Sequence, residues 1–384
     1  MRRVLITGAR APIALDLARS FRAAGVEPHL ADSVTSWCAR LSTLSRAHLH
    51  HHAPPRFAFE VFRRDLERLV EELDPALIVP TCEEVFYVAE AAARGGFAER
   101  VFAPGPAVLR PLHSKVDFAH LALEAGLSAP LTARLSEWDD LEERLTQCRQ
   151  LVFKPEFSRF GSHTLVGPEE RALYPILPLP DAPWAAQALV KGEEFCLWSA
   201  ARDGRIVAFC AYRPLWRLGR SASFAFERVD DPALLAVATA IAKATNATGH
   251  LSFDVIKSAD GQVHPLECNP RGISGLHLFA DDPRLARALM GEESDLVTPT
   301  AAIRHLGPAM WLIGLPQALA SGRIGAFFAD MKRGGDALTR PGDRLPALGA
   351  LIDGARFAAV GLSRGRSAAG QSTDDIEWNG EPIR

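Results

Sequence analysis

The residues best suited to chemistry are two acids and an amide on either side of a predicted tight turn. Alternating apolar residues flank Asp260-Gly261, which predicts a two-residue hairpin loop, because both central residues of a type I′ turn need positive φ. In the register that this loop sets, Asp254 faces Glu267 and Ser252 faces Asn269. The facing Cβ atoms would lie ~4.5 to 5.5 Å apart, so the carboxylates would repel each other unless a cation lay between them. Because oxygen ligands suit Mg²⁺ or Mn²⁺, we predict a metal site of Asp254, Glu267 and Asn269.

The alternative for this pair of acids is an exposed acidic face of a sheet. The neighbours Phe253, Val255, Pro265 and Leu266 are apolar, which favours a buried pair of strands and therefore the metal site. Cys268 points to the opposite face of its strand by the period of two, so we expect it to fill the core rather than act as a nucleophile.

The elements that would position these residues begin with a doubly wound α/β segment. Short apolar runs alternate with helical periodicity in the first third of the chain, which is typical of βαβ units and a parallel sheet. A dinucleotide site does not fit, because Arg10 and Ile13 stand where the fingerprint GxGxxG needs glycine. The run His50-His51-His52 could be a metal site or a solvated connection, and its place before Pro54-Pro55 favours the connection. The expected strands are 4–7, 26–31 and 76–81, and the expected helices are 13–24, 59–72 and 83–93.

From residue 113 the pattern changes to that of a small α+β lid followed by long hairpins. Asp203-Gly204 carries the same turn signal as the first hairpin, and its register places Arg213 opposite Glu194. The chain after Ser367 is expected to be loose, behind a closing subdomain that begins near residue 311. The expected helices are 115–125, 138–148 and 232–245, and the expected lid strands are 131–133 and 150–154.

Composition restricts the class of protein. The chain has 384 residues, 48% of them hydrophobic and 23% charged, with a net charge of -3, which is neither a disordered tail nor a basic partner of nucleic acid. Its six cysteines form no CxxC pair, so we expect reduced thiols and a cytoplasmic protein rather than a disulfide framework or zinc ribbon. No apolar run approaches the ~20 residues that span a bilayer, so no membrane partner is expected.

Taken together, the residues resemble the ATP-grasp ligases, in the order and spacing of members like D-alanine ligase and carbamoyl-phosphate synthetase. The stretches that carry the resemblance are Lys115, 151–155, 187–194, Asp254, Glu267, Asn269 and Arg271. The resemblance implies an ATP-grasp fold, α/β and α+β in class, preceded by a doubly wound parallel-sheet domain. The implied parts are a pre-ATP-grasp domain (1–112), a small lid subdomain (113–186), a metal and nucleotide subdomain (187–300) and a C-terminal closing subdomain (301–384).

The resemblance also implies roles in nucleotide binding. Lys115 and Lys154 would reach the phosphates, where an ammonium charge offsets that of the triphosphate. A loop containing Ser158, Gly161 and Ser162 would cover the phosphates with its backbone N–H groups. For Lys115 the alternative is an ordinary surface lysine.

The segment after the lid would hold the nucleoside. By resemblance, the backbone of residues 187–190 would read the adenine edge, and Glu194 would accept the ribose hydroxyls. The members of this adenine segment are Gln187, Ala188, Leu189 and Val190. Many family members have an acid where this chain has Gln187. The alternative for Glu194 is a plain cross-strand ion pair with Arg213.

The residue that stabilises the transferring phosphoryl group departs from the family pattern. D-alanine ligases carry an arginine at the position of Ser252, so another cation must serve here. The candidates are Arg213, Arg217, Arg220 and Arg271, of which Arg271, just after Asn269-Pro270, is our first choice; its alternative is a surface arginine at a helix start. With Lys154 and Arg213 it completes the predicted catalytic set.

The predicted function is that of an ATP-dependent carboxylate–amine ligase. With ATP and Mg²⁺ (or Mn²⁺) bound, the γ-phosphoryl group would pass to a substrate carboxylate, and an amine would then displace phosphate from the acyl phosphate. The partners are small carboxylate and amine substrates, and a homodimer is left open. One alternative is a carbamoyl-phosphate-synthetase-like enzyme that phosphorylates bicarbonate. Another, from a different class, is a non-catalytic nucleotide-binding regulatory protein.

Overall fold

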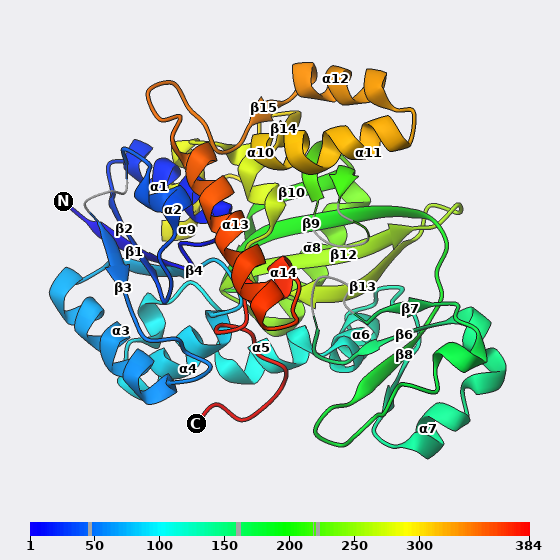
Figure 1. Cartoon of the computed structure of the whole chain (residues 1–384). Coiled ribbons are helices and arrows are strands. Elements are labelled where there is room, and N and C mark those ends of the chain that lie inside the picture. Colours follow the sequence, from blue (N-terminus) through cyan, green and yellow to red (C-terminus); the bar gives the residue numbers. More distant parts are fainter. Residues whose placement is uncertain (45–47, 159–162, 218, 220–222) are drawn as a thin grey trace.

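A parallel sheet forms the first part of the molecule. The computed structural model describes residues 1–44, 48–158, 163–217, 219 and 223–384. Its first sheet has the order β3-β2-β1-β4 and only parallel pairs (Figure 1). The strands are β1 (Arg3–Thr7), β2 (Glu27–Asp32), β3 (Leu49–His51) and β4 (Leu77–Pro80). This confirms the predicted doubly wound segment.

Helices cover both faces of this sheet because its strands are apolar on both sides. Val4 and Ile6 of β1 pack with α1 on one face, whereas Leu5 packs with α3 and α4 on the other. The helices of this part are α1 (Pro12–Ala23), α2 (Trp37–Arg40), α3 (Phe59–Leu73), α4 (Val85–Gly95) and α5 (Pro106–His113). The expected solvated connection at 50–52 is wrong, because His50 and His51 belong to strand β3 and His52 is buried.

A small antiparallel sheet, of order β5-β8-β6-β7, forms the second part. The expected helix over 138–148 is wrong, because α7 stops at Glu142 and a 3-10 helix, η2 (Leu145–Gln150), follows it. With three residues per turn, this 3-10 segment turns both Leu145 and Cys148 toward the core of the small sheet. The elements of this part are α6 (Lys115–Glu124), β5 (Thr132–Leu135), α7 (Trp138–Glu142), β6 (Leu151–Pro155), β7 (Leu165–Val166) and β8 (Trp184–Ala188).

The third sheet has seven strands in the order β13-β12-β9-β10-β11-β14-β15. Helix α8 (Pro232–Thr245), as predicted, packs on one face, and α9 (Pro283–Met290) shares the core on the other face with α1. The strands are β9 (Glu193–Arg202), β10 (Arg205–Arg217), β11 (Ser223–Val229), β12 (Gly249–Lys257), β13 (Val263–Asn269), β14 (Ile303–His305) and β15 (Gly335–Asp336). Since β14 and β15 extend this sheet, part of the predicted closing segment is built onto it; the four-part division of the chain stays a prediction.

The hairpin of β12 and β13 has a different turn from the one expected, yet the same pair of acids. Lys257 pairs with Val263 and Ser258 N–H donates to the carbonyl of Gln262 at 2.9 Å, so the loop has one residue more than predicted. An extra residue in β13, at Leu266, shifts the register back. Asp254 therefore faces Glu267, as the sequence predicts.

In the hairpin of β9 and β10 the turn is the one expected, but the pairing of the strands is not. Asp203 and Gly204 both have positive φ, as a type I′ turn requires. A bulge at Val207 then shifts the register by one residue, so Tyr212 faces Cys196. The predicted pairing of Arg213 with Glu194 is wrong for this reason.

The end of the chain is packed rather than loose. Helices α11 (Leu315–Ala320) and α12 (Ile324–Arg333) lie over one end of the large sheet, and α13 (Pro346–Ser363) runs back against α2 (Figure 1). After α14 (Ala368–Gln371), Ile376 and Trp378 are buried, and the Trp378 ring stacks on Phe86 with centroids 4.7 Å apart. The expectation of a loose tail is wrong, because Trp378 belongs to the core around α4 and Ile376 is buried as well.

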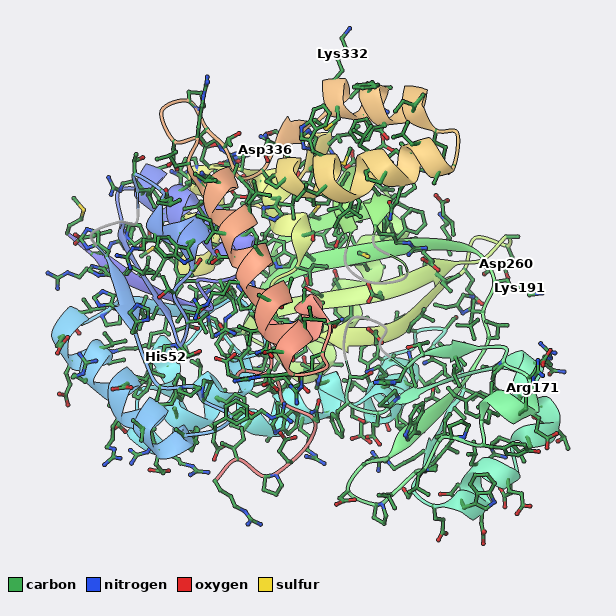
Figure 2. All side chains as sticks on the ribbon, viewed as in Figure 1. His52, Arg171, Lys191, Asp260, Lys332 and Asp336 are labelled. Carbon is green, nitrogen blue, oxygen red and sulfur yellow. The ribbon has the colours of Figure 1, made fainter. Side chains whose placement is uncertain are left out.

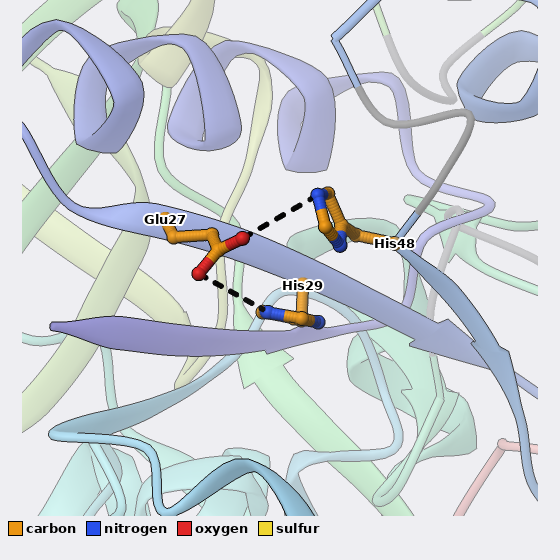
Figure 3. A group of neighbouring side chains, drawn as sticks. All are labelled: Glu27, His29 and His48. Carbon is orange, nitrogen blue, oxygen red and sulfur yellow. Dashed lines mark ion pairs between the residues drawn. The ribbon is translucent and has the colours of Figure 1, made fainter. Parts of the chain in front are cut away.

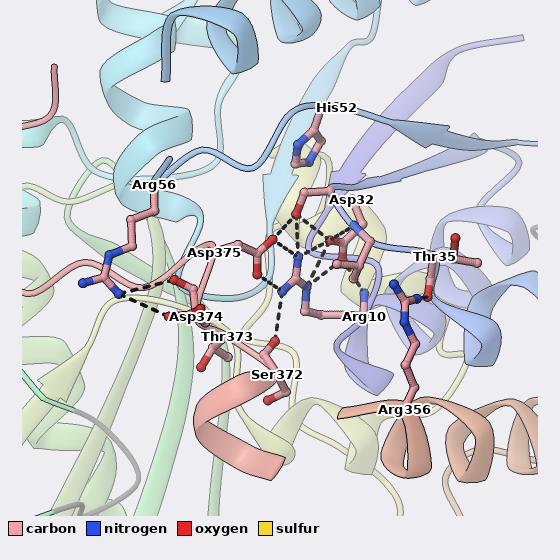
Figure 4. A network of polar contacts seen from close by, with 12 residues as sticks. Arg10, Asp32, Thr35, His52, Arg56, Arg356, Ser372, Thr373, Asp374 and Asp375 are labelled. Carbon is pink, nitrogen blue, oxygen red and sulfur yellow. Dashed lines mark hydrogen bonds and ion pairs between the residues drawn. The ribbon is translucent and has the colours of Figure 1, made fainter. Parts of the chain in front are cut away.

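A buried ion-pair network ties this tail to the first sheet (Figure 4). The Arg10 guanidinium lies 2.5 Å from an Asp32 carboxylate oxygen and 2.6 Å from one of Asp375, and Ser33 also donates to Asp375. Asp32 is the acid at the end of β2 that a dinucleotide fold would offer to ribose, and here it binds Arg10.

Across the described parts of the chain, no helix combines the length and the apolar character needed to cross a membrane.

We predict that Asp375→Asn lowers the free energy of unfolding by about 1–3 kcal/mol, because it removes a charged partner from buried Arg10. Burial acts to raise the pKa of Asp375, but the hydrogen bond and the charge of Arg10, together with the hydrogen bond from Ser33, outweigh it and leave that pKa lowered. The wild-type contribution is therefore present above the unfolded-state pKa of about 3.9 and is lost as the pH falls through the folded-state pKa. Urea unfolding at pH 7 measures the loss, with exposed Asp181→Asn as the control. Equal stability of the two variants would contradict the prediction.

Candidate functional site

The predicted pair of acids meets two buried lysines. The Glu267 Oε2 atom lies 3.5 Å from Lys154 Nζ and 4.0 Å from Lys115 Nζ. Lys154 comes from β6 of the small sheet, Lys115 from the start of α6, and Glu267 from β13 of the large sheet. The structure therefore brings together charges from both sheets at one point.

The electrostatics of the pair follow from its burial. Burial raises the pKa of Asp254, and the neighbouring Glu267 carboxylate raises it further, to about 7. Burial also acts to raise the pKa of Glu267, but the ammonium groups of Lys115 and Lys154 outweigh it and lower that pKa to about 2. Burial lowers the pKa of Lys115 to about 8, against the attraction of Glu267. Glu267 is thus ionised at neutral pH, and its negative charge disfavours ionisation of Asp254 beside it.

Lys115 is held in place by the end of β6. Its Nζ donates to the carbonyls of Ser158 at 2.9 Å and Glu156 at 3.3 Å, and only 3% of the residue is exposed. The Glu156 carboxylate in turn accepts a 2.5 Å hydrogen bond from the Ser114 hydroxyl and a 2.6 Å bond from Arg134. The alternative of an ordinary surface lysine does not hold.

Arg271 links the side-chain amide of Asn269 to Glu83, which follows strand β4 of the first sheet. Its Nε donates to Glu83 at 2.7 Å, and an Nη atom lies 3.5 Å from the Asn269 side-chain oxygen. The Ser252 hydroxyl donates to the Arg271 carbonyl at 2.6 Å and so holds the backbone of our first candidate. Arg271 is largely buried, which rules out the surface alternative.

The segment predicted to hold adenine joins the two sheets. Gln187 is buried and its amide donates to Thr132 and to the Leu266 carbonyl, so this side chain is already occupied. The N–H groups of Ala188 and Leu189 bond to the carbonyls of Leu131 and Gln150. Adenine recognition by this segment must therefore use other groups, such as those of Val190.

Beyond Val190 the segment lies beside the turn of the β12–β13 hairpin. Figure 2 shows Lys191 and Asp260 at the same end of the large sheet. An added Cβ at Gly192 would lie 2.2 Å from the Lys257 carbonyl, so this position requires a glycine. The nucleoside segment is thereby fixed against the hairpin that carries the acids.

Two predicted arginines lie elsewhere. Arg213 pairs with Glu193 at 3.0 Å and Glu227 at 2.8 Å, and Arg217 pairs with Glu194 at 2.5 Å. Both line an open pocket of about 490 Å³ together with Glu194, which is half-exposed. The structure therefore does not bring Arg213 to the two acids, because Arg213 faces Glu227 on β11 and its guanidinium is held by Glu193 and Glu227.

Part of the predicted phosphate loop can be placed. Ser158 follows β6, and its hydroxyl donates to the Pro155 carbonyl at 3.2 Å. Gly161 and Ser162, and also Arg220, lie outside the described residues.

The sequence reasoning missed two acids that hold the site. Glu83 follows β4 and binds Arg271, and Glu156 follows β6 and anchors Ser114 and Arg134. Glu156 comes directly after β6 and Glu83 lies three residues after β4, so both stand near the end of a strand, where charged side chains gather, and that signal was available in the sequence.

The fold of this chain is similar to that of several solved structures. No family model matches the chain, and no curated protein matches it. Among solved structures, N5-carboxyaminoimidazole synthetase from Staphylococcus aureus, complexed with ADP, is similar to it with 13% identity over 83% of this chain and 86% of that one, at a TM-score of 0.65.

Two further structures agree with the first. Phosphoribosylamine–glycine ligase from Thermotoga maritima shows 16% identity, 78% coverage of each chain and a TM-score of 0.59. L-amino acid ligase from Bacillus licheniformis shows 14% identity, 75% coverage of this chain and 74% of that one, and a TM-score of 0.56. All three are ATP-grasp ligases. This chain has the ATP-grasp fold.

The donor set of this ATP-grasp chain fits a hard divalent cation. Two carboxylates and an amide oxygen share one hairpin, which is the oxygen chemistry that Mg²⁺ prefers. Burial and the Glu267 carboxylate raise the pKa of Asp254, so a divalent cation beside this pair would favour its ionised form. The residues present therefore fit Mg²⁺.

We predict that Glu267→Gln weakens binding of MgATP at least about tenfold, because it removes both a cation ligand and the partner of two lysines. Calorimetric titration with a non-hydrolysable ATP analogue and Mg²⁺ measures the affinity, and circular dichroism checks the fold. The matched control is Glu99→Gln, an exposed residue. Unchanged affinity in Glu267→Gln would show that the hairpin acids do not hold the metal.

Proposed function

We propose that this protein is an ATP-dependent ligase that joins a carboxylate to an amine through an acyl phosphate, releasing ADP and phosphate. The observation that carries the proposal is the meeting of Asp254 and Glu267 with two buried lysines in an ATP-grasp fold. Phosphoryl transfer depends on positioning and charge neutralisation, and this cluster offers both.

In this proposal, different residues of the site bind different parts of the nucleotide. Lys115 and Lys154 bind the phosphates, and Asp254, Glu267 and Asn269 hold Mg²⁺, which neutralises phosphate charge when bound. Within the segment 187–190, Val190 contacts adenine, because the Gln187 side chain and the N–H groups of Ala188 and Leu189 have other partners. Glu194 accepts the ribose hydroxyls. Structures of N5-carboxyaminoimidazole synthetase contain ADP, which supports ATP as the cosubstrate of this fold.

Arg271 orients the group that receives the phosphoryl. Its planar guanidinium offers parallel N–H donors to a carboxylate or phosphoryl group, and Glu83 fixes its direction. Lys154 and Arg271 form the catalytic pair of this proposal. Arg213 is left out of it, because its guanidinium is held by Glu193 and Glu227.

The chemistry proceeds in two displacements. A substrate carboxylate oxygen attacks the γ-phosphorus, the bond to the β-γ bridging oxygen breaks, and ADP leaves. The amine then attacks the acyl carbon and phosphate leaves, while the amine proton is lost to solvent or a base. Water must be excluded, since an exposed acyl phosphate hydrolyses.

We predict that hydroxylamine, supplied with ATP, Mg²⁺ and the correct acid but without the amine, traps an acyl hydroxamate with one ADP released per trap. Screening pools of amino acids and carboxylic acids for phosphate release identifies the acid, and mass spectrometry identifies the hydroxamate. Lys154→Ala is the inactive control. AMP as the nucleotide product would contradict the proposal.

The same assay separates the two alternatives. ATP turnover that needs bicarbonate and no other acid would indicate a carbamoyl-phosphate-synthetase-like enzyme. Nucleotide binding with no acid-dependent turnover in any pool would indicate a regulatory binder.

We predict that Arg271→Lys lowers acid-dependent kcat by at least about tenfold, because a point charge cannot reproduce the two parallel donors of arginine. Affinity for MgATP should change much less, since Arg271 serves the acceptor end. The control is Arg284→Lys, whose side chain binds only Asp282 among the contacts described. A loss of nucleotide affinity equal to the loss in kcat would instead assign Arg271 to nucleotide binding.

A further inference from the structure

A second group of ligand-type side chains lies on the first sheet, away from the hairpin acids. Glu27 and His29 point to the same face of β2, and His48 stands just before β3 (Figure 3). The Glu27 carboxylate lies 3.5 Å from His48 Nε2 and 4.0 Å from His29 Nε2. One ligand atom from each residue falls within 4.8 Å of the others.

The His29 ring is oriented with its free nitrogen toward this group. Its Nδ1 atom lies 3.0 Å from Nε2 of His50, and one of these two nitrogens must donate. Its Nε2 atom is buried, since only 7% of the side chain is exposed, and among the described residues this atom has no hydrogen-bond partner. A buried polar atom without a hydrogen bond is costly, and a metal ion would satisfy it.

The Glu27 carboxylate is shared between this group and an arginine. Arg3 faces the same carboxylate, 3.6 Å from Glu27 Oε2, which leaves Glu27 Oε1 on the side of His48.

We propose that Glu27, His29 and His48 form a site for a divalent transition-metal ion of the zinc class. Two imidazoles and one carboxylate select Zn²⁺ over Mg²⁺, which prefers oxygen ligands alone. His50 is a positioning residue that fixes the His29 ring through its Nδ1 atom, as the outer partners of metal-bound histidines do. Arg3 stays paired with the second oxygen, Oε2, of the Glu27 carboxylate.

The fit requires a movement of the ligand side chains. In a tetrahedral site, ligand atoms ~2.1 Å from the ion lie ~3.4 Å from one another, so separations of up to 4.8 Å must close by up to about 1.4 Å. Glu27 and His48 are 29% and 28% exposed, so both can rotate, and solvent can supply a fourth ligand.

The site would tie a short edge strand to its neighbour. Strand β3 has three residues and lies at the edge of the first sheet, where it pairs with β2 alone. The Leu30 N–H already donates to the His48 carbonyl at 2.8 Å, so an ion shared by Glu27, His29 and His48 would join the same two segments through their side chains. The proposed ion is therefore structural and does not enter the ligase reaction.

The test uses the full chain after removal of metals with a chelator. Titration with Zn²⁺ against a chromophoric competitor should show one site of submicromolar affinity, and Co²⁺ should give the absorption bands of a tetrahedral site with nitrogen ligands. His29→Asn and His48→Asn should each lose this site. His51→Asn, an exposed histidine of the same strand, is the matched control and should keep it.

Two further variants make the result specific. His50→Ala should weaken Zn²⁺ affinity about 10- to 100-fold without abolishing it, because it removes only the orienting partner. Glu267→Gln should leave this affinity unchanged, which separates the site from the hairpin acids and from the proposed ligase function. Absence of stoichiometric binding, or binding that survives both His29→Asn and His48→Asn, would overturn the proposal.

Discussion

Two carboxylates that face each other on neighbouring strands are the constraint on which the rest of this structure depends. Asp254 and Glu267 cannot both be ionised in a buried hairpin without cations beside them, and the chain supplies two, Lys115 and Lys154. Neither lysine belongs to the hairpin or to its sheet. The charge of one hairpin therefore requires the small sheet and the start of α6 to lie against it.

The contacts around the site serve this arrangement. Glu156 fixes the backbone from which Lys115 is held, and Gln187 ties the small sheet to the Leu266 carbonyl. Leu266 is also the bulged residue that restores the pairing of the acids, so the same irregularity sets the register and provides an acceptor between the sheets. Backbone groups left unpaired by a bulge are free for such a contact.

The first sheet joins the site through a separate ion pair. Glu83, three residues after β4, holds Arg271, and the packed C-terminal tail closes the same edge of that sheet through Asp375 and Arg10. Buried ion pairs of this kind add little net stability compared with apolar packing, but they fix which groups lie together. The three sheets thus converge on one group of charges, which the proposed ligase uses and which the proposed zinc site does not touch.

The sequence alone determined the elements with strong local signals: the parallel strands, helix 232–245 and the Asp203-Gly204 turn. The facing of Asp254 with Glu267 was also predicted, but from a two-residue turn that the hairpin does not have, and the bulge at Leu266 restores it. The resemblance to the ATP-grasp ligases singled out Lys115, Lys154 and Arg271, and for Lys154 the apolar neighbours also indicated a buried position. Only the tertiary structure decided the bulges at Val207 and Leu266, the burial of the tail, and the partners Glu83 and Glu156. These depend on contacts between segments far apart in the chain, and neither local propensity nor periodicity contains that information.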